Sequence, residues 1–146
     1  TYAIGVADNQ KDFYESADEL EHAINKIILH LNVHQPIDRI IEKYCYETMK
    51  RAVKYIDLIE ISHTDKEYET LHSHVKEVVD LFTIAFRLYL KSEWERIKYE
   101  SDLANVGKKY DEKECIAKLL KNFKQNELIA IIQADLLENG LDIAKY

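Results

Sequence analysis

Apolar side chains recur every three or four residues along the first part of the chain, which is the period of an amphipathic α-helix. The first such stripe predicts a helix from about Asn9 to Val33. Its members are Phe13, Ala17, Leu20, Ile24, Ile27 and Leu31. Pro36 follows the break in this pattern and suits the first turn of a second helix, because the missing N–H of proline is not needed there.

The second stripe predicts a helix from Pro36 to about Ile61. Further apolar positions widen this stripe beyond the seam of a coiled coil, so we expect the helix to contact more than one neighbour. Thr64 and Glu67 then have the spacing of a capping box, which begins the next helix. Because the turn before Thr64 is short, we expect the second and third helices to pack antiparallel.

The third predicted helix is the longest and extends from about Asp65 to Leu103. Between Val78 and Leu90 it is apolar around most of its circumference, so we expect this segment to be enclosed at the centre of the fold. The polar residues of this window lie on one narrow stripe and are Asp80, Thr83 and Arg87. A buried carboxylate needs a partner, so we expect Asp80 to face solvent or to form an ion pair, with a role in a ligand pocket as the alternative.

The third helix is also longer than its predicted partner, so its overhanging end needs another neighbour. The overhang contains Trp94, Ile97 and Leu103. Two short helices are predicted after a linker that contains Gly107, with Asp111 and Asn126 as their N-terminal caps and Gly140 at the end. The pattern predicts an all-α bundle of three long antiparallel helices plus two short C-terminal helices. We expect one domain over residues 1–146, with residues 1–8 disordered or irregular.

Composition narrows the possible partners. The chain is 47% hydrophobic and 32% charged, and its formal net charge of −7 disfavours binding to nucleic-acid phosphates. No apolar run reaches the roughly 18 residues of a membrane span, and the first residues lack the layout of a signal peptide. A cytoplasmic protein is the simplest expectation. Cys45 and Cys115 have no metal-like spacing and are expected to be buried thiols.

One alternative function is a di-metal site in a helical bundle. Such sites use Glu-x-x-His motifs, which occur here as Glu19 to His22 and as Glu69 to His72. A composition rich in Glu and His supplies such pairs by chance, so solvated helix faces are the favoured interpretation.

A second alternative uses two carboxylate motifs, Asp57-x-x-Glu60 and Glu77-x-x-Asp80. The spacing places both acids of a motif on one helix face, and carboxylate oxygens suit Mg²⁺. Over residues 57–90 this arrangement is similar to the all-α nucleoside triphosphate pyrophosphohydrolases of the MazG and dimeric dUTPase type, although Asp57 stands where that family has Glu. The resemblance implies a Mg²⁺ site at these four residues and hydrolysis of nucleoside triphosphates.

Protein binding is the favoured function, because the apolar stripes are wide and no catalytic set is evident. The chain has ten tyrosines, a residue that is enriched at protein interfaces. Tyr46 and Tyr99 lie off the main stripes, and together with Trp94 they are the predicted interface residues. We therefore expect a non-catalytic helical module, without a cofactor, that binds another protein or forms a homo-oligomer.

Overall fold

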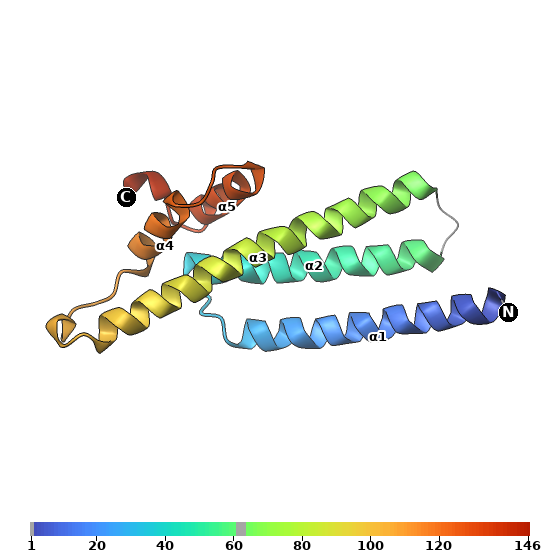
Figure 1. Cartoon of the computed structure of the whole chain (residues 1–146), viewed down its shortest axis with the longest axis horizontal. Coiled ribbons are helices and arrows are strands. Elements are labelled where there is room, and N and C mark those ends of the chain that lie inside the picture. Colours follow the sequence, from blue (N-terminus) through green and yellow to red (C-terminus); the bar gives the residue numbers. More distant parts are fainter. Residues whose placement is uncertain (1, 61–63) are drawn as a thin grey trace. The chain divides into compact units, whose positions relative to one another are not determined.

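The computed structural model describes the backbone of residues 2–60 and 64–146, and the side chains of residues 11–12, 14–58 and 64–146. Within these ranges the chain contains helices and no strand, so the predicted all-α class is confirmed. The elements are α1 (Tyr2–Leu29), α2 (Pro36–Glu60), α3 (Asp65–Ser101), η1 (Leu103–Asn105), α4 (Glu112–Lys121), α5 (Glu127–Glu138) and η2 (Ile143–Lys145), as Figure 1 shows.

The predicted helix starts are confirmed where a side chain caps the helix. Thr64 and Glu67 form the capping box: the Glu67 N–H donates to Thr64 Oγ1 (3.2 Å) and the Thr64 N–H donates to Glu67 Oε2 (2.9 Å). Asp111 and Asn126 each accept a hydrogen bond from the backbone N–H three residues later, at 3.1 and 2.9 Å. These side chains satisfy N–H groups that have no partner inside the helix.

Three predicted helix ends differ from the structure. The first helix begins at Tyr2 and ends at Leu29, so residues 2–8 are helical, although we expected them to be disordered or irregular. A single glycine, Gly5, costs too little to interrupt a helix. Helix α3 ends at Ser101, because the Asp102 side chain accepts a hydrogen bond from the N–H of Ala104 and starts the separate turn η1. Gly107, with a φ of +79°, follows that turn and does not end α3.

The chain divides into two compact units whose boundaries fall inside α2 and α3. Unit 1 comprises Thr1–Leu31 and Lys43–Val79, and unit 2 comprises Asn32–Glu42 and Asp80–Tyr146. Helices α2 and α3 therefore each have one end in unit 1 and the other end in unit 2.

In unit 1, two polar contacts join α2 to α3. Tyr55 and Tyr68 share a hydrogen bond between their hydroxyl groups, and their ring centroids are 4.9 Å apart. Arg51 Nη1 donates to the backbone carbonyl oxygen of His74 (2.6 Å). The earlier residue of α2 contacts the later residue of α3, which is the order of an antiparallel pair.

The core of unit 2 is formed by the start of α2, the middle of α3, and α4 and α5. Its fully or nearly buried apolar residues are Ile37, Ile40, Ile41, Leu81, Ala85, Leu88, Ile116, Ala117, Leu120, Ile129, Ile132, Leu136 and Leu141. In α3 these buried positions fall on one face, whereas Leu90 is 52% exposed. The expectation that α3 is enclosed nearly all round as far as Leu90 is therefore wrong, because the rest of unit 2 covers one side of the helix.

Candidate functional site

A strip of exposed apolar side chains follows the C-terminal half of α3. Leu90, Trp94 and Ile97 are four and three residues apart, so they lie on one face of the helix. Their exposed fractions are 52%, 61% and 50%. Contiguous exposed apolar side chains of this size mark interaction sites more often than single ones do. We call these three residues the α3 stripe.

The opposite face of α3 is held by Tyr110, which precedes α4. The Tyr110 hydroxyl donates to the carbonyl oxygen of buried Ser92 (3.1 Å) and lies 3.3 Å from Ser92 Oγ. The rings of Tyr99 and Tyr110 pack at 5.6 Å between centroids. Burial raises the pKa of the Tyr110 hydroxyl, which therefore stays protonated and able to donate. Because Ser92 and Tyr99 lie about half a turn away from the α3 stripe, these contacts leave the stripe facing outward.

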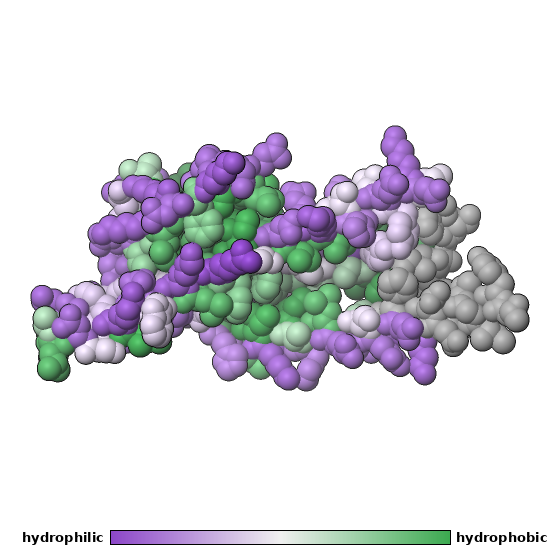
Figure 2. Space-filling view, viewed as in Figure 1, coloured by the Kyte–Doolittle hydropathy of each residue, from purple (hydrophilic) through white to green (hydrophobic). Residues whose placement is uncertain are grey.

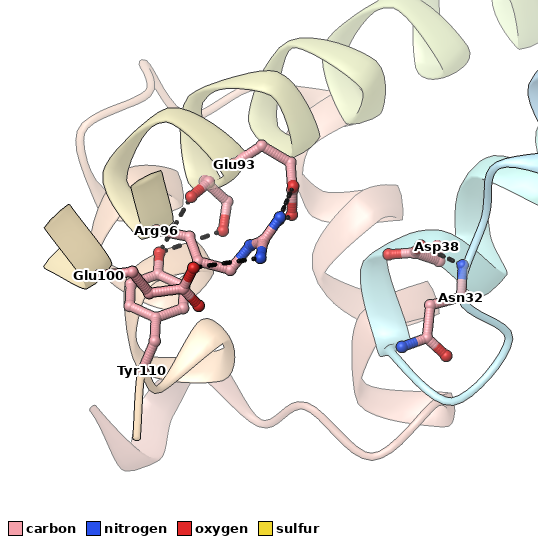
Figure 3. Close-up of polar contacts among 7 residues, drawn as sticks. Asn32, Asp38, Glu93, Arg96, Glu100 and Tyr110 are labelled. Atoms are coloured by element: carbon pink, nitrogen blue, oxygen red, sulfur yellow. Dashed lines mark hydrogen bonds and ion pairs between the residues drawn. The ribbon is translucent and has the colours of Figure 1, made fainter. Parts of the chain in front are cut away.

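An acidic border runs along one side of the α3 stripe. A helix turns by about 100° per residue, which places Glu93 and Glu100 together on this side. Arg96 lies behind them, where its guanidinium bonds the Glu93 carboxylate and has one nitrogen 3.5 Å from a Glu100 oxygen (Figure 3). The hydrogen bond and charge of Glu93 raise the pKa of Arg96, so the guanidinium stays protonated.

A basic border runs along the other side of the stripe, where the same geometry places Lys91 and Lys98. Lys98 Nζ lies 2.5 Å from a carboxylate oxygen of Glu95. Lys91 Nζ lies 5.4 Å from the centre of the Phe123 ring, a cation–π contact. The α3 stripe is thus an apolar face with opposite charges along its two edges.

A cluster of carboxylates lies in unit 2, beside the features of α3 described above. Its first member is Asp38, in the first turn of α2. Asp38 is 3% exposed, and its Oδ2 accepts a hydrogen bond from the Asn32 N–H (2.6 Å). Its other oxygen, Oδ1, is buried without a hydrogen-bond donor among the described residues. Figure 3 shows this oxygen turned toward the side on which Glu93 and Arg96 lie. Burial raises the pKa of Asp38, and the charge of Glu93 adds to the rise.

Glu112, at the start of α4, completes this cluster. Burial, together with the charges of Asp38 and Glu93, raises the pKa of the half-buried Glu112 to about 7. The same carboxylates also raise the pKa of Tyr89, after burial as the main cause. Among the described side chains, no group of three or more His, Cys, Asp or Glu has an arrangement that holds a metal ion. The cluster is a set of buried and half-buried carboxylates, of which Glu112 changes charge near neutral pH.

A shallow hollow of about 570 Å³ lies between the end of α3 and α4. Its wall includes the packed rings of Tyr99 and Tyr110. The charged side chains around it carry both signs and include Glu95, Lys98, Lys109, Asp111, Glu114 and Lys118. A small-molecule site usually combines a deep apolar wall with a few convergent polar groups, and this open, mixed-charge hollow does not fit that description.

The structure separates the three residues predicted as an interface. Trp94 is the centre of the α3 stripe. Tyr99 is half-buried against Tyr110 and lines the hollow, so it faces away from Trp94. Tyr46 is 53% exposed but belongs to unit 1.

Leu90 and Ile97 were missing from the predicted interface. The sequence pattern places Ile97 in the overhanging end of the helix and Leu90 in the enclosed window. The spacing of four and three residues around Trp94 was the signal that could have joined all three.

The alternative metal ligands have the following places. Asp57 and Glu77 are exposed in unit 1, whereas Asp80 is half-buried in unit 2. The side chain of Glu60 lies outside the described residues. All four residues of the Glu-x-x-His motifs are exposed, namely Glu19, His22, Glu69 and His72.

Comparisons of the chain with protein-family models, curated proteins and solved structures find no match. Among the helices that the structure describes, none has both the length and the apolar character that a membrane span requires.

Proposed function

We propose that this chain is a non-catalytic helical module that binds another protein, or a second copy of itself, through the α3 stripe. The observation that carries the proposal is the exposure of Leu90, Trp94 and Ile97, each at 50% or more, on a helix whose opposite face is covered. Burial of apolar surface contributes about 25 cal/mol per Å² to association, before the costs of ordering. Tryptophan is also enriched among the residues that dominate binding energies.

The scaffold of this module, in our proposal, is one domain in which the three long helices pack antiparallel. The contacts of Tyr55 with Tyr68 and of Arg51 with His74 support this order for α2 and α3. A helix that is held along one side presents its other side as a rigid surface, which lowers the entropy cost of binding.

The proposal also includes the class of partner and the cellular location of the module. A net charge of −7 opposes contact with nucleic acid, so we propose a protein as the partner. Cys45 is buried, Cys115 is half-buried, and neither forms a disulfide, which fits a cytoplasmic location.

Photo-crosslinking tests the proposal directly. A photoreactive benzophenone amino acid replaces Trp94 in one variant and Lys113, which is exposed on α4, in the control variant. We expect covalent adducts with a protein at position 94, loss of these adducts when Leu90→Ser and Ile97→Ser are added, and none at position 113. Equal adduct yields at both positions would show that the stripe is not a binding surface.

A nucleotide assay tests the non-catalytic part of the proposal. The purified chain is incubated with nucleoside triphosphates and Mg²⁺, beside the Glu77→Gln variant. We expect no turnover by either protein. Turnover that the Glu77→Gln substitution abolishes would overturn the non-catalytic assignment and support the pyrophosphohydrolase alternative.

A further inference from the structure

We infer that the α3 stripe pairs with the α3 stripe of a second copy of this chain, and that the two helices run parallel. This inference rests on the proposed function and names the partner. It is carried by the exposed apolar spacing of the stripe and by the opposite charges along its two borders.

The spacing of the stripe is that of a coiled-coil seam. Leu90, Trp94 and Ile97 alternate by four and three residues, as the positions that face a partner helix do. Ser101 continues this spacing at the C-terminal end and is exposed, whereas the charged and exposed Arg87 ends the seam before Leu90. Because the apolar part of the seam is short, we expect a weak and reversible pair rather than a permanent dimer.

The charges on the borders choose between the two possible directions of the helices. In a parallel pair related by a two-fold axis along the helices, the acidic border of each copy faces the basic border of the other. In an antiparallel pair the two-fold axis crosses the helices, and each border faces its own kind. Opposite charges attract and like charges repel across such a seam, so the parallel pair is favoured.

The same geometry predicts which charges meet. Glu93 and Lys98 flank the seam on opposite sides and are five residues apart, which is the spacing of interhelical ion pairs in parallel coiled coils. Glu93 of each copy therefore faces Lys98 of the other. Within one chain these residues pair with Arg96 and Glu95. Such pairs at a protein surface contribute little, so they exchange readily for pairs between copies.

The surroundings of the stripe allow a second helix to approach. Tyr110, which precedes α4, lies against the opposite face of α3 through its contacts with Ser92 and Tyr99. Beyond the helix, Leu103 and Val106 are 87% and 76% exposed, and Figure 2 shows hydrophobic side chains at the tip of this turn. They provide further apolar surface close to the end of the seam.

Sedimentation equilibrium and fluorescence measure the pairing. Trp94 is the only tryptophan of the chain, so its emission reports burial of the stripe as protein concentration rises. We expect a monomer–dimer equilibrium accompanied by a shift of emission to shorter wavelength. The double variant Leu90→Ser, Ile97→Ser should weaken association at least tenfold. The control Leu137→Ser, which changes a leucine that is 57% exposed on α5, should leave association unchanged.

Charge reversal tests the borders. Lys98→Glu places a glutamate opposite Glu93 of the other copy, and Glu93→Lys places a lysine opposite Lys98 of the other copy. We expect each variant alone to associate more weakly than the wild-type chain, and an equimolar mixture to regain association, because both ion pairs form again between unlike variants. Circular dichroism of each variant checks that the helices are retained. A mixture that associates no better than its components would overturn the predicted contact.

A disulfide tests the direction. Ser101→Cys, combined with Cys115→Ser, places one exposed thiol on the seam. In a parallel pair the two introduced thiols lie opposite each other, within the reach of a disulfide. We expect a covalent dimer on mild oxidation, whereas the matched control Lys113→Cys, also with Cys115→Ser, should stay monomeric.

The outcomes separate this inference from the proposed function. A chain that stays monomeric at every concentration, yet still forms adducts with a different protein at position 94, overturns self-pairing and leaves the proposed function in place. Loss of both self-association and the adducts at position 94 overturns the inference and the proposed function together. A dimer that persists unchanged in the Leu90→Ser, Ile97→Ser variant also overturns the inference, because pairing would then use another surface.

Discussion

Asp38 and Glu112 are carboxylates whose surroundings favour the protonated form. Both lie in unit 2, and the pKa of each is raised mainly by burial. Arg96 lowers the pKa of Glu112, but less than burial and the neighbouring acids raise it. At neutral pH these side chains therefore oppose folding, and part of the stability of unit 2 should depend on pH.

The first prediction concerns Glu112. Its pKa is about 7 in the folded chain, against an ordinary value of 4.5, so the folded state binds this proton more tightly. The stability that results is complete below pH 4.5 and is lost as the pH rises through 7. Glu112→Gln removes this dependence, on the order of 1 kcal/mol between pH 5 and 8 once solvent screening of the half-exposed carboxylate is included. Urea unfolding at the two pH values measures it. The exposed control Glu127→Gln should follow the wild-type chain, and the same pH dependence in Glu112→Gln would contradict the assignment.

The second prediction concerns Tyr110. Tyr110→Phe keeps the ring packed on Tyr99 but removes the hydroxyl that donates to the carbonyl oxygen of Ser92. We expect a loss of about 1 kcal/mol in the free energy of unfolding, the usual net contribution of one hydrogen bond. Denaturant unfolding measures the loss. Tyr14→Phe, at a tyrosine that is 46% exposed, should change stability little, and equal effects would contradict the role of the Ser92 contact.

Among the helices, α3 shows most clearly that one element serves two purposes. Leu88 is fully buried in the core of unit 2, while Leu90 belongs to the exposed α3 stripe. Two residues along a helix correspond to about 200°, so the two leucines lie on opposite faces. The first contributes to folding, and the second is available for binding.

The third prediction compares these two leucines. Leu88→Ala should lower the free energy of unfolding by about 2–5 kcal/mol, because it leaves a cavity in the core. Leu90→Ala should change it by less than about 0.5 kcal/mol, as substitutions on a surface do. Denaturant unfolding at low protein concentration, where copies do not pair, compares the two. Similar losses in both variants would show that the exposed face of α3 has been assigned wrongly.

The fourth prediction concerns the start of α5. The Asn126 side chain accepts the N–H of Ile129, so Asn126→Ala leaves that group without its cap. We expect a loss of about 1 kcal/mol in the free energy of unfolding. Thermal unfolding followed by circular dichroism measures it, with exposed Gln125→Ala as the neighbouring control. No loss in Asn126→Ala would show that the cap does not stabilise the helix.

For the molecule as a whole, pairing through the α3 stripe links stability to concentration. A second copy that binds the folded chain and not the unfolded chain stabilises it by mass action. The fifth prediction is therefore a Tm that rises with protein concentration. Differential scanning calorimetry at several concentrations measures this rise. The Leu90→Ser, Ile97→Ser variant should show a constant Tm, and a constant Tm in the wild-type chain would contradict pairing.

The sequence by itself determined the helical class, the order of the five α-helices and most of their starts. The capping box at Thr64 and the caps at Asp111 and Asn126 were predicted, because each connects residues three apart and depends on little else. Periodicity also predicted which face of each helix is apolar. These are local properties, which a single element expresses wherever it packs.

Only the tertiary structure decided which apolar residues are covered. The pattern alone suggested that α3 is enclosed as far as Leu90, yet Tyr110 packs on the opposite side of the helix and the α3 stripe stays exposed. The structure also brought Asp38, Glu93 and Glu112 together from three helices, and no local pattern marks their meeting. Burial and charge are set by neighbours that are distant in the sequence. The binding face and the pH-dependent acids therefore follow from packing, and the helices that carry them follow from the sequence.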